Sequence, residues 1–264
     1  MKASSFGIGL IAAALALGAA NAQSIVQESA EDWAHIAVPG MNCVLANNVW
    51  DRKIVPDGFA QSVFLEKHGN ETLPGWRWNA PGKRETVLSM PELICGDKPW
   101  DEPQHLHAGF PFRAGEKKPH AAFDIEVEAQ GHYNMAFSFW AVSKLPAVKA
   151  NISHEIMIWT VNSGMKPGGT KIGSLEVGGT VFDLYFDDRQ GVITGPDPFT
   201  WTLISFVARK PLTKGKLDFG PFIECLLARQ ILTRDHILTS LELGDEVSEG
   251  TGRVVVRKLE LGIR

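Results

Sequence analysis

The chain has 264 residues and a formal net charge of −4, and 21% of its residues are charged. This weakly acidic net charge does not favour binding to nucleic acid or to an anionic membrane, so we expect neither as a partner. The 26 glycines and 15 prolines indicate many turns. The 8 tryptophans, against only 2 tyrosines, suggest rings that stack on a ligand, although several must belong to the core.

The first 22 residues have the pattern of a secretory signal peptide. Lys2 gives a positive start, an apolar stretch runs over Phe6–Ala19, and Ala20-Asn21-Ala22 is a small-residue cleavage site. A membrane anchor is the alternative, but the apolar stretch is short for a span. We therefore expect a signal peptide over residues 1–22, a single domain over residues 23–264, and a secreted or periplasmic location.

Short alternating segments separated by turn residues continue from there to the end of the chain, a pattern typical of an all-β sandwich or barrel. The expected strands are Cys43–Trp50, Gln61–Lys67, Gly75–Asn79, Glu85–Cys95, Ala122–Ala129, Tyr133–Trp140, Glu155–Val161, Lys171–Val177, Thr180–Phe186, Phe199–Ala208, Ser240–Val247 and Arg253–Leu261. Turns are expected at residues 81–82, 166–169, 178–179 and 195–198.

One helix is expected, over Phe219–Arg229, with Asp218 as its N-cap and Pro221 in its first turn. Its apolar positions predict that it closes one side of the core. Cys225 falls on this helix, so Cys43–Cys95 is the favoured pairing if the exported protein forms a disulfide, although the sequence leaves the pairing open.

The strand around Glu155 has an unusual face. Side chains alternate between the two faces of a strand, so Glu155, Met157 and Trp159 share one side. A carboxylate, a thioether and an indole together are more typical of the floor of a sugar-binding groove than of a core. Paired carboxylates cleave glycosidic bonds, and Glu246 is a second candidate in the strand near the C-terminus.

Three further strands carry candidate sugar-binding residues. Asn48 and Trp50 share one strand face, and Trp76 and Trp78 share another. Such indoles can stack on pyranose rings, although an isolated tryptophan is more often part of a core.

In the segment Tyr133–Trp140, Asn134 and Ser138 lie on the face opposite Tyr133, Met135, Phe137 and Phe139, which form a core face. Their polar groups can bind a catalytic carboxylate or a sugar hydroxyl. The alternative is an ordinary half-buried strand with a solvated face.

Six segments together resemble glycoside hydrolase family 12, and the resemblance runs over nearly the whole chain after the signal peptide. The most specific is His154-Glu155-Ile156-Met157-Ile158-Trp159. The others are Asn47-Asn48-Val49-Trp50, Gly75-Trp76-Arg77-Trp78-Asn79, Pro91-Glu92-Leu93-Ile94-Cys95-Gly96, Tyr133-Asn134-Met135-Ala136 and Gly244-Asp245-Glu246-Val247.

The resemblance implies a fold and an activity. The fold is a β-jelly roll, a sandwich of two curved antiparallel sheets with one α-helix on the convex side and an open cleft across the concave sheet. The activity is that of an endo-β-1,4-glucanase that acts on cellulose, mixed-linkage glucan or xyloglucan and retains the anomeric configuration by double displacement.

The resemblance also implies roles for individual residues. Glu155 corresponds to the nucleophile, Glu246 to the general acid/base and Met157 to the residue beneath the nucleophile. Asn48 and Trp50 correspond to sugar-binding residues.

Three positions depart from the family pattern. Asn134 stands where an Asp usually binds the nucleophile, Asp51 stands where a Gly is usual, and Asp245 stands where an aromatic residue is usual. Asp245 is expected to point into the core, where an unpaired carboxylate is costly, and to fray the sheet there.

The second hypothesis is a non-catalytic glycan-binding protein on the same scaffold, which Asn134 keeps open. A glycan lyase is a distant third. His105 and His107 have strand spacing but no evident third ligand, so we expect no metal and no cofactor. The expected partner is a β-1,4-glucan polysaccharide, and we expect a monomer, although the sequence does not establish the oligomeric state.

Overall fold

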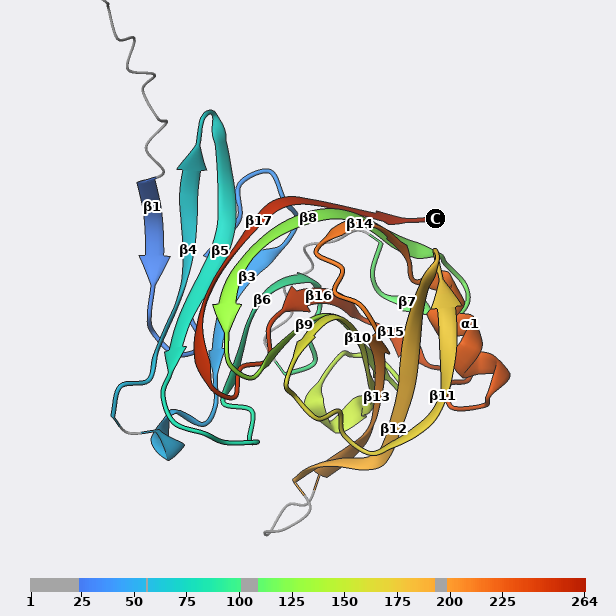
Figure 1. Cartoon of the computed structure of the whole chain (residues 1–264). Helices are drawn as coiled ribbons and strands as arrows, with labels where there is room; N and C mark the ends of the chain where they lie inside the picture. The colour runs from blue at the N-terminus through green and yellow to red at the C-terminus, as the bar shows by residue number, and fades with distance from the viewer. Residues whose placement is uncertain (1–23, 56, 101–108, 193–198) are drawn as a thin grey trace, which may run out of the picture.

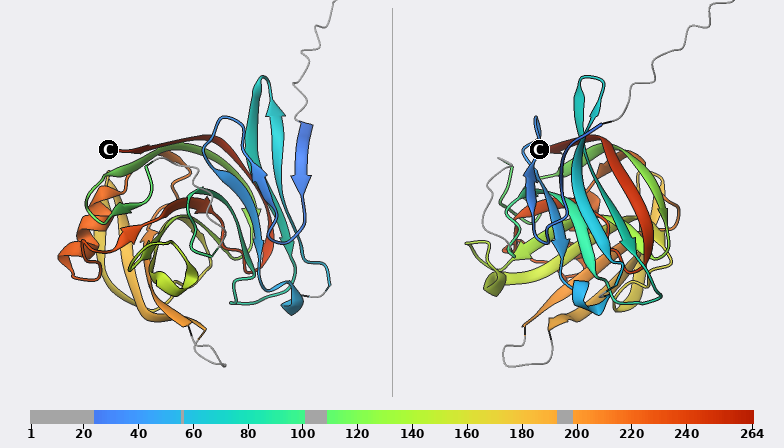
Figure 2. Two further views of the ribbon diagram at one scale, coloured as in Figure 1. Left: turned by 180° about the vertical axis from the view of Figure 1, so that it is seen from behind. Right: turned by 90° about the vertical axis from the view of Figure 1, so that its left-hand side faces the viewer.

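The computed structural model describes residues 24–55, 57–100, 109–192 and 199–264. The expected signal peptide, the histidines His105 and His107 and the expected turn at residues 195–198 lie outside the described residues. The described chain forms two sheets that curve in the same sense, one lying over the other (Figures 1 and 2).

The smaller sheet has six strands in the order β1-β4-β5-β17-β8-β14. Their bounds are β1 Ser24–Ser29, β4 Ala60–His68, β5 Glu71–Ala80, β8 Pro119–Gln130, β14 Lys214–Asp218 and β17 Gly250–Ile263. The long strands β8 and β17 form the curved top of the molecule in Figure 1. All neighbours in this sheet are antiparallel.

The larger sheet has eleven strands, with the main order β11-β12-β13-β10-β9-β16-β6-β3-β2 and the short β15 and β7 beside β9. Their bounds are β2 His35–Ala37, β3 Val44–Val49, β6 Ser89–Gly96, β7 Phe112–Arg113, β9 Tyr133–Val142, β10 Ile152–Ser163, β11 Thr170–Val177, β12 Thr180–Val192, β13 Phe199–Ala208, β15 Ile237–Leu238 and β16 Ser240–Gly244. Its pairs are antiparallel except β10 with β13, which run parallel.

The expected sandwich is confirmed, and every expected strand overlaps an observed one. Five observed strands had no expected counterpart: β1, β2, β7, β14 and β15. Four of them have two to five residues, and the fifth, β1, lies at the edge of its sheet. Such segments show too few alternations for periodicity to identify them.

The main core lies between the two sheets. The expected core face of β9, formed by Tyr133, Met135, Phe137 and Phe139, is buried there. Phe137 packs edge-on against Phe123 of β8, with ring centroids 5.1 Å apart. The alternation read from the sequence therefore assigned this strand face correctly.

A single α-helix among the described residues, α1 (Gly220–Ala228), packs on the core side of the eleven-stranded sheet. Phe222 meets Phe182 of β12 and Phe206 of β13 at centroid distances of 5.0 and 4.9 Å. The N-cap is Phe219, so the expectation of Asp218 is wrong by one residue; Asp218 instead accepts a 2.9 Å hydrogen bond from the backbone N–H of Gly220. The helix thus closes one side of the core as expected, one residue shorter at each end.

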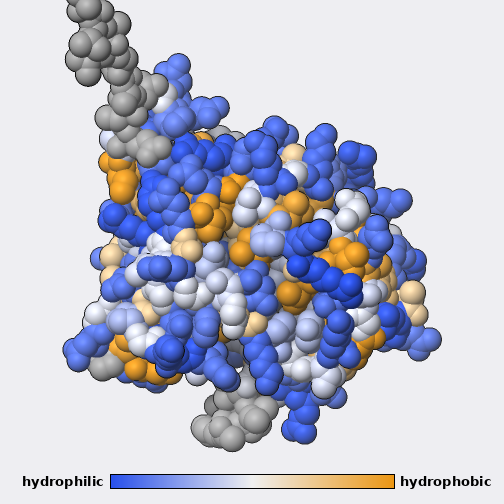
Figure 3. Space-filling model, in the orientation of Figure 1, coloured by the Kyte–Doolittle hydropathy of each residue, from blue (hydrophilic) through white to orange (hydrophobic). Residues whose placement is uncertain are grey.

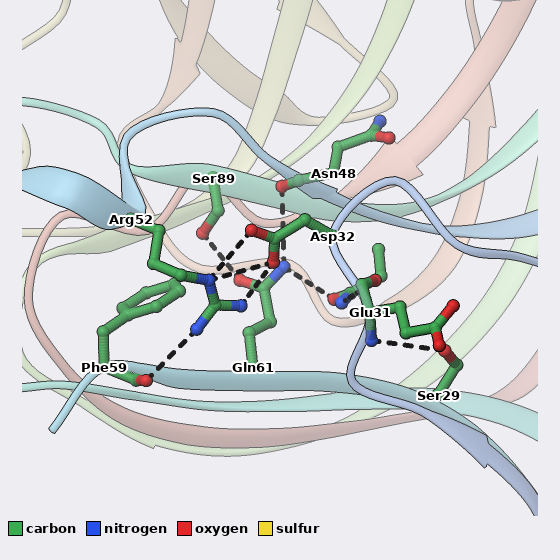
Figure 4. Close-up of polar contacts among 9 residues, drawn as sticks. Ser29, Glu31, Asp32, Asn48, Arg52, Phe59, Gln61 and Ser89 are labelled. Atoms are coloured by element: carbon green, nitrogen blue, oxygen red, sulfur yellow. Dashed lines mark hydrogen bonds and ion pairs between the residues drawn. The ribbon is translucent and has the colours of Figure 1, made fainter. Parts of the chain in front are cut away.

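A buried glutamine ties the two sheets together near the end of β3 (Figure 4). Gln61 of β4 donates to Asn47 Oδ1 at 2.9 Å and accepts from Ser89 Oγ at 2.6 Å. Figure 4 shows the carbonyl of Asn48 turned toward Gln61 while its side chain points away. The bridge fixes β3 so that Asn48 projects from the opposite face of the larger sheet.

The expected disulfide is present between Cys43 and Cys95, and Cys225 is a free thiol. The bond joins the residue before β3 to β6, its neighbour in the sheet. None of the described helices is long and apolar enough to cross a membrane. The face seen in Figure 3 is mostly hydrophilic, with apolar residues in small groups.

The disulfide closes a loop with a sequence separation of 52 residues. Loop-closure entropy then predicts that Cys43→Ala/Cys95→Ala lowers the free energy of unfolding by up to about 4 kcal/mol. Urea unfolding followed by tryptophan fluorescence measures this. Cys225→Ser is the matched control and should leave the unfolding midpoint nearly unchanged; equal losses in both variants would contradict a stabilising role for the bond.

Candidate active site

The candidate site lies on the face of the eleven-stranded sheet that points away from the main core, which we call the site face. Glu155 of β10 projects from it, directly opposite Trp140 of β9 on one side and Leu203 of β13 on the other. Ile156 and Ile158 project from the other face into the main core. The two faces expected for this strand are therefore confirmed.

Glu155 is held by one indole. Trp201 Nε1 donates to Glu155 Oε2 at 2.8 Å. Burial, and after it the neighbouring charge of Glu246, raise the pKa of Glu155 to about 8, against the opposing effect of the Trp201 hydrogen bond. Glu246 thus lies near enough for its charge to act on Glu155.

Glu246 follows β16 and is clamped by Asn134 of β9. The Asn134 amide donates to the Glu246 carboxylate, and its oxygen accepts from the Glu246 backbone N–H at 2.9 Å. Burial raises the pKa of Glu246 to about 7, against the opposing effect of this hydrogen bond. The expected contact of Asn134 with Glu155 is wrong, because Asn134 lies opposite Asn162, several residues along β10 from Glu155.

The charge of Glu246 makes Glu155 harder to ionise. Both pKa values lie well above those of free glutamate. Near neutral pH the pair therefore retains protons, and a form with one carboxylate beside one carboxylic acid is populated. This is the protonation state that acid–base chemistry on a single bond requires.

Apolar side chains are packed on the site face near the pair. Met157 and Trp159 of β10 are buried on the site face with Met90, Ala136, Leu203 and Val207. The Trp159 indole N–H points at the sulfur of Met157, at 3.4 Å. Met157 thus lies on the same strand face as Glu155, as expected, while Trp159 is too deeply buried to present its ring to a ligand.

Ser138 lies on the site face directly opposite Met157. Its hydroxyl is buried and has no hydrogen-bond partner among the described residues, and the same holds for Ser205 on the other side of Met157. The alternative of a solvated face for β9 is wrong, since Asn134, Ser138 and Trp140 are all buried.

Beside the pair lies a buried group of charges, the Lys98 triad, made of Glu92, Lys98 and Glu242. Lys98 Nζ lies 2.6 Å from Glu92 Oε1 and 3.0 Å from Glu242 Oε2. Asn48 also donates to Glu92 Oε1. Asn48 is therefore buried against Glu92, where it supports the triad and is withdrawn from direct contact with a sugar.

The two tryptophans expected on β5 are not in the site. Trp76 and Trp78 are 0% and 4% exposed and lie in the main core between the sheets. The prediction that they bind substrate is wrong. Strand alternation correctly gave them one shared face, and that face is the inner one. Trp50, in contrast, is 42% exposed and remains available to a ligand.

Asp245 points into the core, as expected, but the sheet does not fray there. Its carboxylate accepts a hydrogen bond from the Trp76 indole. Its backbone N–H bonds to Pro91, and Val247 continues the pairing with Ser89. Burial raises the pKa of Asp245 to about 8, so at pH 7 it is mostly a neutral acid and tolerates the core.

The sequence reasoning missed a group of aromatic rings next to Glu155. Trp100 packs edge-on against Trp140, Phe199 and Trp201, with centroids 5.4 to 5.6 Å apart. Strand alternation along β13 already puts Trp201 on the same face as Leu203 and Ser205. Only the pairing of β13 with β10 shows that Glu155 lies on this face too. Lys98 lies outside any strand and carried no periodic signal.

Comparison with known proteins agrees with this architecture. The family model for glycosyl hydrolase family 12 matches residues 41–260. A xyloglucan-specific endo-beta-1,4-glucanase from Phytophthora sojae is 25% identical over 232 residues, which cover 83% of each chain. A protein of the same name from Phytophthora nicotianae is 25% identical over 78% of this chain and 79% of its own.

Solved structures show the same fold. A family 12 xyloglucanase from Bacillus licheniformis superposes with a TM-score of 0.79 at 25% identity, covering 90% of this chain and all of that one. An endoglucanase from Rhodothermus marinus superposes with a TM-score of 0.71 at 20% identity, covering 90% and 99% of the two chains. The jelly roll expected from the sequence is confirmed.

Asp245 gives a pH-dependent test of this geometry. In the unfolded chain its carboxyl ionises near pH 4, whereas in the folded protein its pKa is about 8. The folded state therefore holds a proton that the unfolded state has lost, and this contribution to stability, full below pH 4, declines as the pH rises to 8. Asp245→Asn keeps an acceptor for Trp76 and removes the decline.

The gain in unfolding free energy of Asp245→Asn over the unsubstituted protein should grow by roughly 1.4 kcal/mol per pH unit between pH 5 and pH 8. Urea unfolding at several pH values measures it. Asp188→Asn, at an exposed position, is the control and should give a constant difference. A constant difference for Asp245→Asn as well would show that this carboxyl is not held neutral.

Proposed function

The chain belongs to glycosyl hydrolase family 12, and from this we propose that it is a secreted endo-β-1,4-glucanase that cleaves internal bonds of xyloglucan, mixed-linkage glucan or cellulose with retention of configuration. The observation that carries the proposal is the pair Glu155 and Glu246, brought together on one sheet face and electrostatically coupled. The signal-peptide pattern of residues 1–22 supports secretion.

In the proposed reaction Glu155 is the nucleophile and Glu246 the acid/base. The Glu155 carboxylate attacks the anomeric carbon while the Glu246 carboxyl gives its proton to the leaving glycosidic oxygen, which departs as an alcohol. A covalent glycosyl-enzyme results. The Glu246 carboxylate then takes a proton from water, the water oxygen attacks the anomeric carbon, and the bond to Glu155 breaks. Both carboxyls return to their starting forms.

Each carboxyl of the pair has its own hydrogen-bond donor. The Trp201 N–H donates to Glu155 and favours its charged form, and the Asn134 amide does the same for Glu246. In the free pair the shared proton can reside on either carboxyl, and only the form with Glu246 protonated is productive. Glu246 exchanges its proton twice per turnover, and the Asn134 clamp on both its backbone and its side chain holds it in place for this.

Xyloglucan is the first substrate to test. The two Phytophthora relatives are named for xyloglucan specificity, and the Bacillus licheniformis structure is a xyloglucanase. Exposed Trp50 and the partly exposed ring of Trp201 offer stacking surfaces on the same protein. A decorated glucan needs room beside its backbone, and open stacking surfaces leave that room.

A non-catalytic glycan binder remains the second candidate, because Asn134 stands where the family usually has an Asp and brings no charge. Asn134 contacts Glu246, however, and not the proposed nucleophile. Glu155 instead has Trp201 as its donor. A pure binder also has no need for two buried, coupled carboxyls, which cost folding free energy.

Glu155→Gln should lower reducing-end release from xyloglucan, mixed-linkage glucan and carboxymethyl cellulose by at least about 1,000-fold, because an amide cannot attack the anomeric carbon. Glycan binding and the unfolding midpoint should stay near those of the unsubstituted protein. Glu260→Gln, on the outside of the smaller sheet, is the control. Retained activity in Glu155→Gln would exclude it as nucleophile, and an inactive but glycan-binding parent protein would favour the binder.

Glu246→Ala should separate the two proposed roles. It should slow polysaccharides severely while sparing the first step on aryl glucosides with good leaving groups, which need little protonation. Stopped assays of the aryl leaving group measure this, and proton NMR of the first product reports whether configuration is retained. Equal losses on both substrate types would count against Glu246 as the acid.

A further inference from the structure

We propose that Lys98 is a positioning residue of the active site, where its ammonium group orders Glu92 and Glu242 and supplies the positive charge that keeps one of Glu155 and Glu246 ionised. The inference rests on the proposed function of that pair. Lys98 lies in the segment between β6 and β7. Its described ion pairs are to Glu92 and Glu242 and not to either carboxyl of the pair.

Lys98 and its two carboxylate partners form a buried group in close contact. Lys98 Nζ contacts both Glu92 and Glu242, at 2.6 and 3.0 Å, and all three side chains are at least nine-tenths buried. Glu242 also accepts from Ser240 Oγ at 2.9 Å. A buried ammonium costs several kcal/mol to desolvate, and replacing such groups by apolar ones is often neutral or stabilising. Stability alone is therefore a weak reason for a lysine here.

A series of contacts leads from the triad to Glu155. Glu242 Oε2 accepts from the Trp140 indole at 3.2 Å, and the Trp140 ring lies 5.8 Å from that of Trp201. Trp201 in turn donates to Glu155. Each indole is thus oriented by a carboxylate at its N–H, and the two rings pack on each other. Moving Glu242 moves the donor that holds the nucleophile.

Lys98 also acts on the pair through its charge. Lys98 lowers the pKa of both Glu155 and Glu246, and among the described residues it is the only cation that acts on both. Glu242 acts against it, on Glu155 alone. Without a cation, burial would keep both members of the pair protonated near neutral pH, and no carboxylate would be available for attack.

A second cation, Lys149, lies over the rings of Trp100 and Phe199, 5.1 and 5.3 Å from their centroids, and is not among the charges that shift the pKa of either carboxyl. Neighbouring strands β9 and β13 present uncharged residues toward Glu155, including Trp140 and Trp201. Asp187 of β12, opposite Leu203, is acidic. The pKa of Glu92 is raised well above its ordinary value, chiefly by burial, while its contact with Lys98 lowers it.

The test is a titration that does not require turnover. Glutamate side chains labelled with ¹³C at the carboxyl are followed by NMR against pH, with Glu155→Gln and Glu246→Gln assigning the pair. Lys98→Met should raise the pKa of both members of the pair by roughly one unit, whereas Glu242→Gln should lower that of Glu155. Lys258→Met, on the smaller sheet, should change neither.

The pH profile of kcat/KM adds a second readout if the protein is active. Its acidic limb should move up in Lys98→Met and down in Glu242→Gln, whereas a merely structural role would lower activity without moving either limb. If Lys98→Met fails to fold, Lys98→Met/Glu242→Gln takes its place, and the Glu246 resonance should still titrate at higher pH, because Glu242 does not act on it.

Unchanged titration of the pair in the Lys98 variants would overturn the inference, whether or not the protein is active. Inactivity of the parent protein on every glucan, with the expected titration shifts present, would instead overturn the proposed function alone. The two failures are therefore distinguishable.

Discussion

The structure depends on how it keeps five carboxyl groups out of water within one region of the larger sheet. Glu92, Glu155, Glu242, Asp245 and Glu246 are buried or partly buried, and a buried carboxylate without a partner is strongly unfavourable. The protein meets this cost with hydrogen-bond donors and one cation. Indoles donate to Glu155, Glu242 and Asp245, side-chain amides donate to Glu92 and Glu246, and Lys98 lies between Glu92 and Glu242. The raised pKa values of the proposed catalytic pair are a by-product of the same burial.

Sheet curvature explains why residues on the outer face of a sandwich are buried at all. Figures 1 and 2 show the larger sheet bending strongly around β9, β10 and β13. Side chains on the inside of such a bend converge, so Met157 and Ser138 are almost as inaccessible as the main core. The bend gives the site its own apolar floor, separate from the core between the sheets. A flat sheet would leave the same residues in water, with ordinary acidities.

Much of the fold followed from the sequence, because strand alternation and turn residues are local. The same alternation could not say which face of an isolated strand is the inner one. β9 was assigned correctly because one of its faces is wholly apolar, whereas β5 carries Arg77 between two tryptophans and reads equally well either way. Trp76 and Trp78 were placed wrongly for that reason. The roles of Lys98 and Trp201 could not be predicted, because they depend on the pairing of β6 with β16 and of β13 with β10. No spacing along the chain encodes those pairings.

The end of β16 shows how tightly that register is held. Asp245 and Glu246 are adjacent, and the chain sends one into the core and the other to the site face, so a slip of one residue would exchange them. Gly244 prevents this. A Cβ there would lie 2.5 Å from Cβ of Glu92 and 2.6 Å from the carbonyl of Pro91, so only glycine allows β16 to approach β6 this closely. The double clamp of Asn134 on Glu246 fixes the other side. Gly244 and Asn134 therefore fix the register in which Glu246, and not its neighbour Asp245, faces the site.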